Sequence, residues 1–171
     1  MLSRVHYPPI DNMLFYQKLR LKKIFSNKEL LLFHFFQEIT QVFPQNLIIM
    51  NEFVFFFLNN ENYFYATSKL PYLRKKFRCR KIVIVREEDV LVNLVYGFFP
   101  DPYIHTVKIE RNFNSGKTEV IIGFLSYKDR GIAVGCKGNY IKAVNEIFER
   151  YVIFIDNEGF RARIKCDVVK L

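Results

Sequence analysis

The order of predicted elements occurs twice along this chain of 171 residues, and that repetition constrains the fold more than any single motif. The first half predicts a helix from Glu29, strands at "NLIIM" and "EFVFFFL", a helix over residues 66–78 and a strand at "KIVIV". The second half predicts the same series and ends in "VIFI". Superposing Ile82–Val85 on Val152–Ile155 aligns the two series at an offset of 70 residues. We therefore predict an internal duplication of two α+β units.

Capping and turn residues fall between these predicted elements. Asn27 is the expected N-cap of the first helix, and Asn51 with Glu52 forms the turn of a hairpin. Pro71 is tolerated only in the first turn of the helix that contains it. In the second half, Pro100–Pro102 ends a helix and Asn114–Gly116 suits a hairpin turn.

Four segments follow from this layout. We expect a basic N-terminal extension over residues 1–26, a first unit over 27–86, a second unit over 87–157 and a basic C-terminal strand or tail over 158–171. The extension contains "LFYQKLRLKKIF", which is basic and amphipathic. That pattern is compatible with an added strand, with a contact to nucleic acid or a partner, or with a segment that orders on binding.

Three glycines lie within eight residues in "DRGIAVGCKGNYIKAVNEIF", directly before a predicted helix. Glycine has no Cβ, so a sugar-phosphate backbone can approach the main chain closely at Gly135 and Gly138. Lys137 between them supplies a positive charge, and Asn139 is the expected N-cap of a helix whose N-terminus favours anions. The spacing fits neither a dinucleotide-binding loop nor a P-loop. A purely structural tight turn is the alternative.

The residues around this loop complete a predicted RNA-binding groove. Ile132, Val134 and Ile141 are expected to form an apolar floor for unstacked bases, with Arg130 and Lys142 at the entrance. The predicted RNA-binding residues are Arg130, Gly135, Cys136, Lys137, Gly138, Asn139, Ile141 and Lys142.

Positive charge is concentrated in one part of the chain. The net charge is +9, and residues 69–86 carry eight Lys and Arg side chains without one acid. Such a stripe indicates attraction to polyanions, although a solvated helix end has the same composition. We expect a secondary basic patch of Arg74, Lys75, Lys76, Arg78 and Arg80. A second cluster near the C-terminus, Arg161, Arg163, Lys165 and Lys170, further favours nucleic acid.

Other function classes are disfavoured. The longest apolar region is interrupted by polar residues before it reaches the roughly 18 to 20 residues of a membrane helix, and no signal-peptide pattern occurs at the N-terminus. Three cysteines without a CxxC pair argue against disulfides and structural zinc. His6, His34 and His105 are scattered, so we expect no enzyme, no cofactor, no metal and no small-molecule substrate. A cytoplasmic location is expected.

The α-β-β-α-α-β order with "GCKG" between two helices resembles a type II KH domain. Two in tandem, joined through "YGFFPDPYIHTVKIE", resemble the short archaeal NusA-type transcription factors over roughly residues 27–155. The resemblance implies helices packed on one face of a small three-stranded sheet in each unit. It also implies a single-stranded RNA-binding factor that acts in transcription termination or antitermination on nascent RNA, with RNA polymerase as a possible partner.

The family's RNA-contacting loop corresponds to Gly135–Gly138 in the second unit only. At the offset of 70, Tyr65–Ser68 occupies the equivalent place in the first unit, and Pro71 stands where the second has Ile141. We therefore expect the first unit to have lost the phosphate-binding loop. Two alternatives remain open: a KH-type protein of the ribosome or its biogenesis, and a scaffold that binds proteins.

Overall fold

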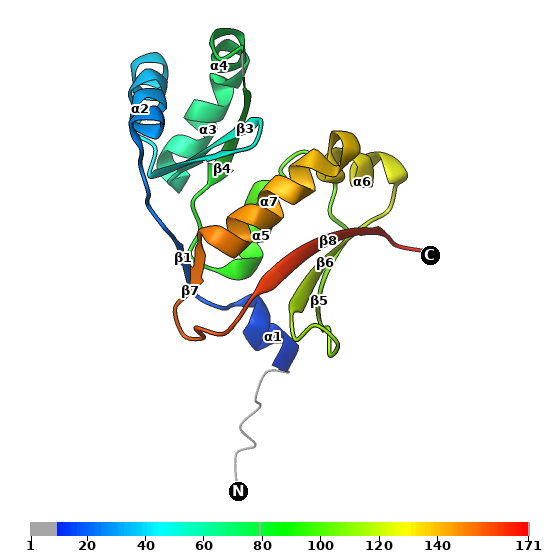
Figure 1. Ribbon diagram of the computed structural model, residues 1–171. Helices are drawn as coiled ribbons and strands as arrows, with labels where there is room; N and C mark the ends of the chain where they lie inside the picture. Colours follow the sequence, from blue (N-terminus) through cyan, green and yellow to red (C-terminus); the bar gives the residue numbers. More distant parts are fainter. Residues whose placement is uncertain (1–9, 79, 171) are drawn as a thin grey trace, which may run out of the picture.

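A computed structural model of the protein describes residues 10–78 and 80–170, which form a mixed α+β fold (Figure 1). The described chain begins with α1 (Ile10–Phe15) and β1 (Leu19–Leu21). A first unit follows, with α2 (Asn27–Thr40), β2 (Asn46–Met50), β3 (Phe53–Leu58), α3 (Asn60–Ser68), α4 (Leu70–Lys76) and β4 (Lys81–Arg86). Its sheet has the order β2-β3-β4, antiparallel between β2 and β3 and parallel between β3 and β4.

The second unit has the same sheet topology. It contains α5 (Leu91–Phe98), β5 (Thr106–Arg111), β6 (Thr118–Phe124), α6 (Tyr127–Val134), the short 3-10 helix η1 (Cys136–Gly138), α7 (Asn139–Arg150), β7 (Val152–Phe154) and β8 (Ala162–Val168). Its sheet has the order β5-β6-β8, with β6 antiparallel to β5 and parallel to β8. The predicted duplication of two α+β units is therefore present in the sheet pairing.

The strand that completes the second sheet is not the predicted one. Residues 152–155 were expected there, but β7 pairs with β1 in a separate two-stranded ribbon. The third strand is β8, in the segment predicted as a C-terminal strand or tail outside the unit. Its buried Ile164 and Cys166 alternate with exposed neighbours, as expected for a strand with one face on the core. A boundary at residue 157 would separate β8 from its own sheet, and the offset of 70 is wrong.

Part of the N-terminal extension belongs to the folded core. Leu19 and Leu21 are buried, and main-chain hydrogen bonds join Lys22 N–H to the Tyr151 carbonyl at 2.8 Å and Ile155 N–H to the Lys18 carbonyl at 3.0 Å. The interpretation as an added strand is confirmed for β1. Residues 1–9 lie outside the described part of the chain.

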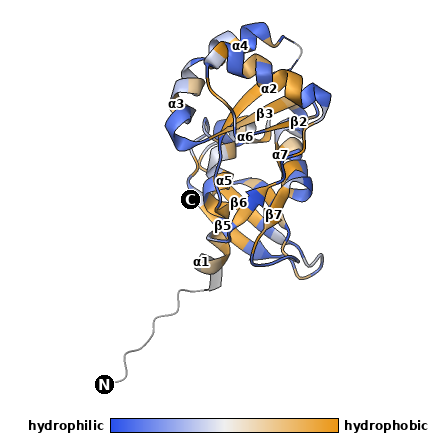
Figure 2. Cartoon of the chain, turned by 90° about the vertical axis from the view of Figure 1, so that its left-hand side faces the viewer, coloured by the Kyte–Doolittle hydropathy of each residue, from blue (hydrophilic) through white to orange (hydrophobic). Residues whose placement is uncertain are grey.

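β3 contributes to the cores on both faces of its sheet, and every residue of this strand is buried. Phe53, Phe55 and Phe57 face a core that includes α5 and α7 of the second unit, whereas the alternate residues face α2, α3 and α4. Figure 2 shows the apolar residues concentrated on the strands. Full burial of one Phe contributes roughly 1.5 to 3 kcal/mol. The sheet of the first unit is thus covered on both faces.

Two helix starts differ from the predictions. Ser26, rather than Asn27, caps α2, because its side chain and that of Glu29 form a reciprocal capping box. The helix predicted over 66–78 is two helices, since the Asn59 side chain accepts a hydrogen bond from Asn62 N–H and starts α3. Pro71 does lie in the first turn of α4. Within residues 10–78 and 80–170, no helix combines the length and apolar character needed to cross a membrane.

Candidate nucleic-acid interface

The α6–α7 junction is built from left-handed backbone. Gly135, Lys137 and Gly138 have φ values of 77°, 52° and 74°. The two glycines have different reasons to lack a side chain. A Cβ on Gly135 would lie 2.7 Å from the Tyr140 Cβ, whereas a Cβ on Gly138 would meet nothing closer than 3.9 Å. Close approach by a ligand backbone was predicted at both glycines. Both have left-handed backbone that favours glycine, but only at Gly135 would a side chain also collide with a neighbour, and Gly138 leaves room for close approach.

Tyr140 fixes this junction to the first unit. Its hydroxyl donates a hydrogen bond to the Phe98 carbonyl, and its ring packs against Phe53, Phe55 and Phe99. Burial raises the pKa of Tyr140 well above its usual range. The ring is therefore part of the core between the units, and stacking on a base is not available to it.

Asn139 does not cap α7, contrary to the prediction. The N-cap position belongs to Gly138, and Asn139 has helical dihedrals. Its side-chain amide donates to Glu52 Oε1 of the β2–β3 turn at 3.1 Å, and Glu52 in turn lies 3.4 Å from Lys81 Nζ. The side chain thus joins the two units, and the first turn of α7 has no side-chain cap.

A groove of about 780 Å3 lies between β8 and the helices α6 and α7. Val134 and Ile141, which flank the glycine loop in sequence, contribute apolar surface to it. Six cationic and three acidic side chains line the groove: Lys117, Arg130, Lys142, Arg161, Arg163, Lys165, Glu146, Glu149 and Asp167. An excess of positive charge around an apolar strip suits a polyanion that carries flat apolar groups.

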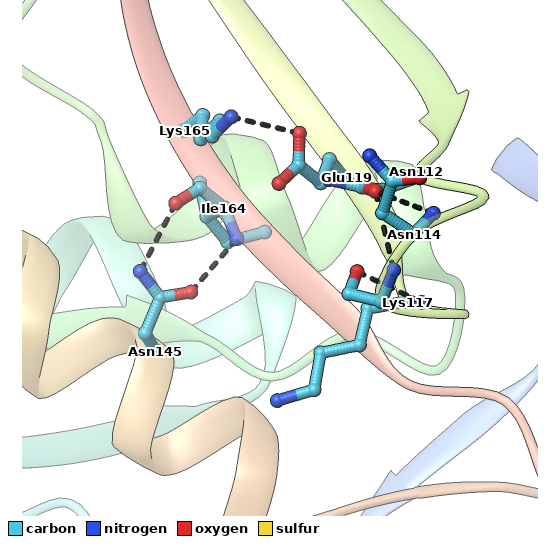
Figure 3. Close-up of polar contacts among 8 residues, drawn as sticks. Asn112, Asn114, Lys117, Glu119, Asn145, Ile164 and Lys165 are labelled. Atoms are coloured by element: carbon cyan, nitrogen blue, oxygen red, sulfur yellow. Dashed lines mark hydrogen bonds and ion pairs between the residues drawn. The ribbon is translucent and has the colours of Figure 1, made fainter.

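The β8 wall of the groove is held by side-chain hydrogen bonds (Figure 3). Asn145 of α7 bonds both main-chain groups of Ile164, with Nδ2 donating to the carbonyl at 3.0 Å and Oδ1 accepting from N–H at 2.7 Å. Lys165 Nζ lies 2.8 Å from Glu119 Oε2. The hydrogen bond from Lys165 lowers the pKa of the Glu119 carboxyl despite its burial. β8 is therefore fixed by side-chain contacts to α7 and to β6.

Arg130 spans the groove from α6. Its Nε donates to the Cys166 carbonyl of β8 at 2.9 Å. The Cys166 side chain is buried, which raises the pKa of its thiol to about 12, so the thiol remains neutral at physiological pH. Cys136, by contrast, is exposed at the junction.

The structure brings part of the predicted site together. Arg130, Ile141 and Lys142 line the groove, as does Val134 of the predicted floor, and Lys137 is exposed at the junction. Gly135, Cys136 and Ile132 instead line a separate crevice of about 330 Å3 between the units, together with Arg74. The predicted apolar floor is thus divided between two cavities. No group of three metal-ligating side chains occurs in the described ranges.

The secondary basic patch has two kinds of member. Arg74, Lys75, Lys76 and Arg78 are exposed at or just after the last turn of α4. Arg80 instead donates from Nη1 to the Asn51 carbonyl at 2.7 Å and is half-buried. Four of the five predicted residues therefore present free charge, and Arg80 has a structural contact.

Several groove residues were not predicted as site residues: Lys117, Asn145, Arg161, Arg163, Ile164, Lys165 and Cys166. The basic C-terminal cluster did indicate nucleic acid. Its place beside the groove could not be predicted, because residues 158–171 were expected to lie outside the second unit. Asn145 has no sequence signal, because its partner is the main chain of a strand 19 residues away.

The first unit has no equivalent loop. Tyr65–Ser68, expected at that place, lies inside α3, and the helices α3 and α4 are joined by Lys69 alone, with φ −89° and ψ −4°. The offset of 70 therefore pairs Gly135–Gly138 with the wrong residues. The junction itself, at Lys69, contains no glycine and no left-handed residue. Its main chain is occupied by helical hydrogen bonds.

The sequence matches no protein-family model and no curated protein. The fold is similar to that in the crystal structure of APE1850, with a TM-score of 0.56 and 21% sequence identity. The similarity covers 82% of this chain and 100% of that chain. At this identity the likeness concerns the fold alone.

Proposed function

We propose that this protein binds single-stranded RNA in the groove between β8 and the α6–α7 helices, as a tandem KH-type protein whose first unit lacks the glycine loop. The observation that carries the proposal is the groove itself, in which six cations and three acids surround Val134 and Ile141. Among the described residues, only Lys165 of the six cations is paired with an acid, Glu119, which lies outside the lining. Gly138 supports it, because its open side leaves room for a phosphodiester backbone.

The arrangement favours a single strand over a duplex. Bases can rest on the apolar strip only if they are unpaired, while their phosphates face Lys137, Lys142 and the uncapped first turn of α7. Cations on the β8 side, Arg161, Arg163 and Lys165, border the other side of the strand. A duplex would offer only phosphates and sugars, and the apolar strip would stay empty.

The cellular role that we propose rests on the sequence resemblance to the NusA-type factors. The protein binds nascent transcripts and acts in termination or antitermination, with RNA polymerase as its partner and without catalysing a reaction. Co-purification tests this part: RNA polymerase subunits should be recovered with the tagged protein. Recovery of ribosomal subunits in their place would assign the same RNA-binding fold to translation.

RNA binding itself is tested by fluorescence anisotropy with labelled single strands of about ten nucleotides. Gly138→Asp places a side chain and a negative charge where the phosphate is expected, so affinity should fall by roughly 100-fold or more. Ser68→Asp adds the same charge to an exposed residue at the end of α3 and should change affinity less than about twofold. Circular dichroism checks that both variants fold.

Two results would contradict the proposal. Equal losses in the two variants would show that the α6–α7 junction has no special role. A duplex of the same length that competes as well as the single strand would show that unpaired bases contribute nothing.

A further inference from the structure

We infer that the groove selects a base with two adjacent hydrogen-bond acceptors, cytosine or guanine, through the main-chain N–H of Cys166 and the guanidinium of Arg130. This inference rests on the proposed RNA binding and adds a base preference to it. The observations that carry it concern the outer edge of β8, which faces the groove.

The direction of each main-chain group on β8 follows from its pairing with β6. Thr118 N–H donates to the Arg161 carbonyl at 3.2 Å, and Val169 N–H donates to the Phe124 carbonyl at 2.8 Å. In a parallel pair, alternate residues direct both main-chain groups to the neighbouring strand. The odd-numbered residues therefore bond β6, and Ile164 and Cys166 direct their N–H and C=O groups to the open edge.

Most of that edge is already occupied by side chains. Asn145 takes both the N–H and the carbonyl of Ile164, at 2.7 and 3.0 Å. Arg130 Nε takes the carbonyl of Cys166 at 2.9 Å. Among the described residues, no hydrogen bond from Cys166 N–H is formed at this edge. The Cys166 N–H thus remains available in the middle of β8, beside the guanidinium of Arg130.

This pattern determines which base edge fits. An open strand edge offers one donor and one acceptor, which match N1 and the N6 amino group of adenine. Here Arg130 covers the acceptor and presents its own N–H groups, so the wall offers two donors side by side. Cytosine matches them with N3 and O2, and guanine with O6 and N7. Uracil places the N3–H donor between its two acceptors and fits less well.

The side chains that hold this pattern are fixed by the fold. Asn145 and Arg130 come from two different helices and contact β8 on successive outward residues. Arg130 is exposed to the groove, and its Nη atoms have no hydrogen-bond partner within residues 10–78 and 80–170. Arg130 is thus a specificity-determining residue as well as a source of charge.

The test uses the full chain and oligouridine strands that carry one central cytosine, guanine or adenine. For the unchanged protein, we expect the cytosine or guanine strand to bind roughly tenfold more tightly than the adenine strand. Arg130→Met removes the donors and frees the Cys166 carbonyl, so adenine should bind at least as well as the other two. Lys142→Met removes the same charge from the same groove and should weaken all strands equally.

The outcomes separate this inference from the proposed function. Failure of every strand to bind would overturn both. Binding with equal affinities, or with a preference for adenine in the unchanged protein, would overturn the base preference and leave RNA binding intact. An equal effect of the Arg130 and Lys142 substitutions on the ratio of affinities would also overturn the role of Arg130. A change of ratio in Arg130→Met alone would support it.

Discussion

The α3–α4 and α6–α7 junctions occupy the same place in two units whose sheets have the same topology, yet they differ in length and in backbone conformation. In the first unit one residue, Lys69, joins the helices, and its dihedrals are near helical. In the second unit four residues join them, and three have positive φ. Both junctions keep main-chain hydrogen bonds, but only the second has a glycine, Gly138, beside which a Cβ would meet no atom closer than 3.9 Å.

The two units also differ in how their sheets are covered. The first unit has both faces of its sheet covered, one by its own helices and the other by the core that contains α5 and α7. The outer face of the second sheet carries exposed charge, including Arg163 and Lys165. The candidate groove is lined only by residues of the second unit.

Of the substitutions at the two junctions, a change of Gly135 should lower the stability of the protein most. Gly135→Ala places a side chain at φ 77° and ψ 174°, a region open essentially to glycine alone, and within 2.7 Å of the Tyr140 Cβ. We expect a loss of about 2 to 4 kcal/mol in the free energy of unfolding, or about 6 to 12 °C in Tm. Differential scanning calorimetry measures it.

Two matched substitutions act as controls for that prediction. Gly131→Ala lies in the helix α6 with nothing near its added methyl group, and should stabilise by roughly 0.5 to 1 kcal/mol. Lys69→Ala at the other junction should change stability by less than about 0.5 kcal/mol. A Gly135→Ala protein as stable as the Lys69→Ala protein would show that the tight packing on Tyr140 is unnecessary.

The order of the strands and helices could be predicted from the sequence, whereas the pairing of the strands could not. The α-β-β-α-α-β order was readable because strand and helix patterns, turns and prolines are local signals. The glycine loop was visible for the same reason. β8 was missed as the third strand because "VIFI" is more apolar than "ARIKCDV", although only the latter forms part of the sheet. Pairing partners are set by tertiary packing, and a short apolar run does not identify them.

Only one side of the candidate site was predicted from the sequence. Arg130, Ile141 and Lys142 lie near the glycines in sequence and were found. The opposite wall depends on the contacts of Asn145 and Arg130 with β8, 19 and 36 residues away. Asn139 was assigned to a cap because that is the commonest local use of Asn, but a carboxylate of the other unit offered a partner.

Neutralising the basic patch of the first unit should lower RNA affinity by a moderate amount. Lys75, Lys76 and Arg78 lie on or just after α4, away from the groove lining, so they can attract RNA only through charge. Changing all three to Gln should lower affinity for every sequence alike. The slope of log affinity against log salt should also fall by about 0.7 for each phosphate that the variant no longer neutralises. Anisotropy titrations over a salt series measure both.

A sequence-dependent loss would contradict this interpretation, because it would place bases on the first unit. Glu38→Gln and Glu61→Gln, at two exposed acids of the first unit, provide a control of opposite sign. These changes should leave the salt slope unchanged and raise affinity slightly.

The ion pairs of the two sheets should contribute little to stability, and by different amounts. Glu119 and Lys165 are 2.8 Å apart with the Glu119 side chain 11% exposed, whereas Glu52 and Lys81 are 3.4 Å apart and both are well exposed. Lys165→Met should therefore lower the free energy of unfolding at pH 7 by roughly 0.5 to 1.5 kcal/mol. Lys81→Met should lower it by less than about 0.5 kcal/mol.

The pH dependence of stability provides a further test of the Glu119–Lys165 pair. The folded pKa of Glu119 is lowered by its hydrogen bond from Lys165, so its contribution is complete above the unfolded pKa of about 4.3. The contribution is lost as the pH falls through the lower folded pKa. Urea unfolding between pH 7 and pH 3 should show the difference between Lys165→Met and the unchanged protein shrinking with acid. A difference that is constant over that range would mean that Lys165 stabilises β8 by packing of its stem and not by charge.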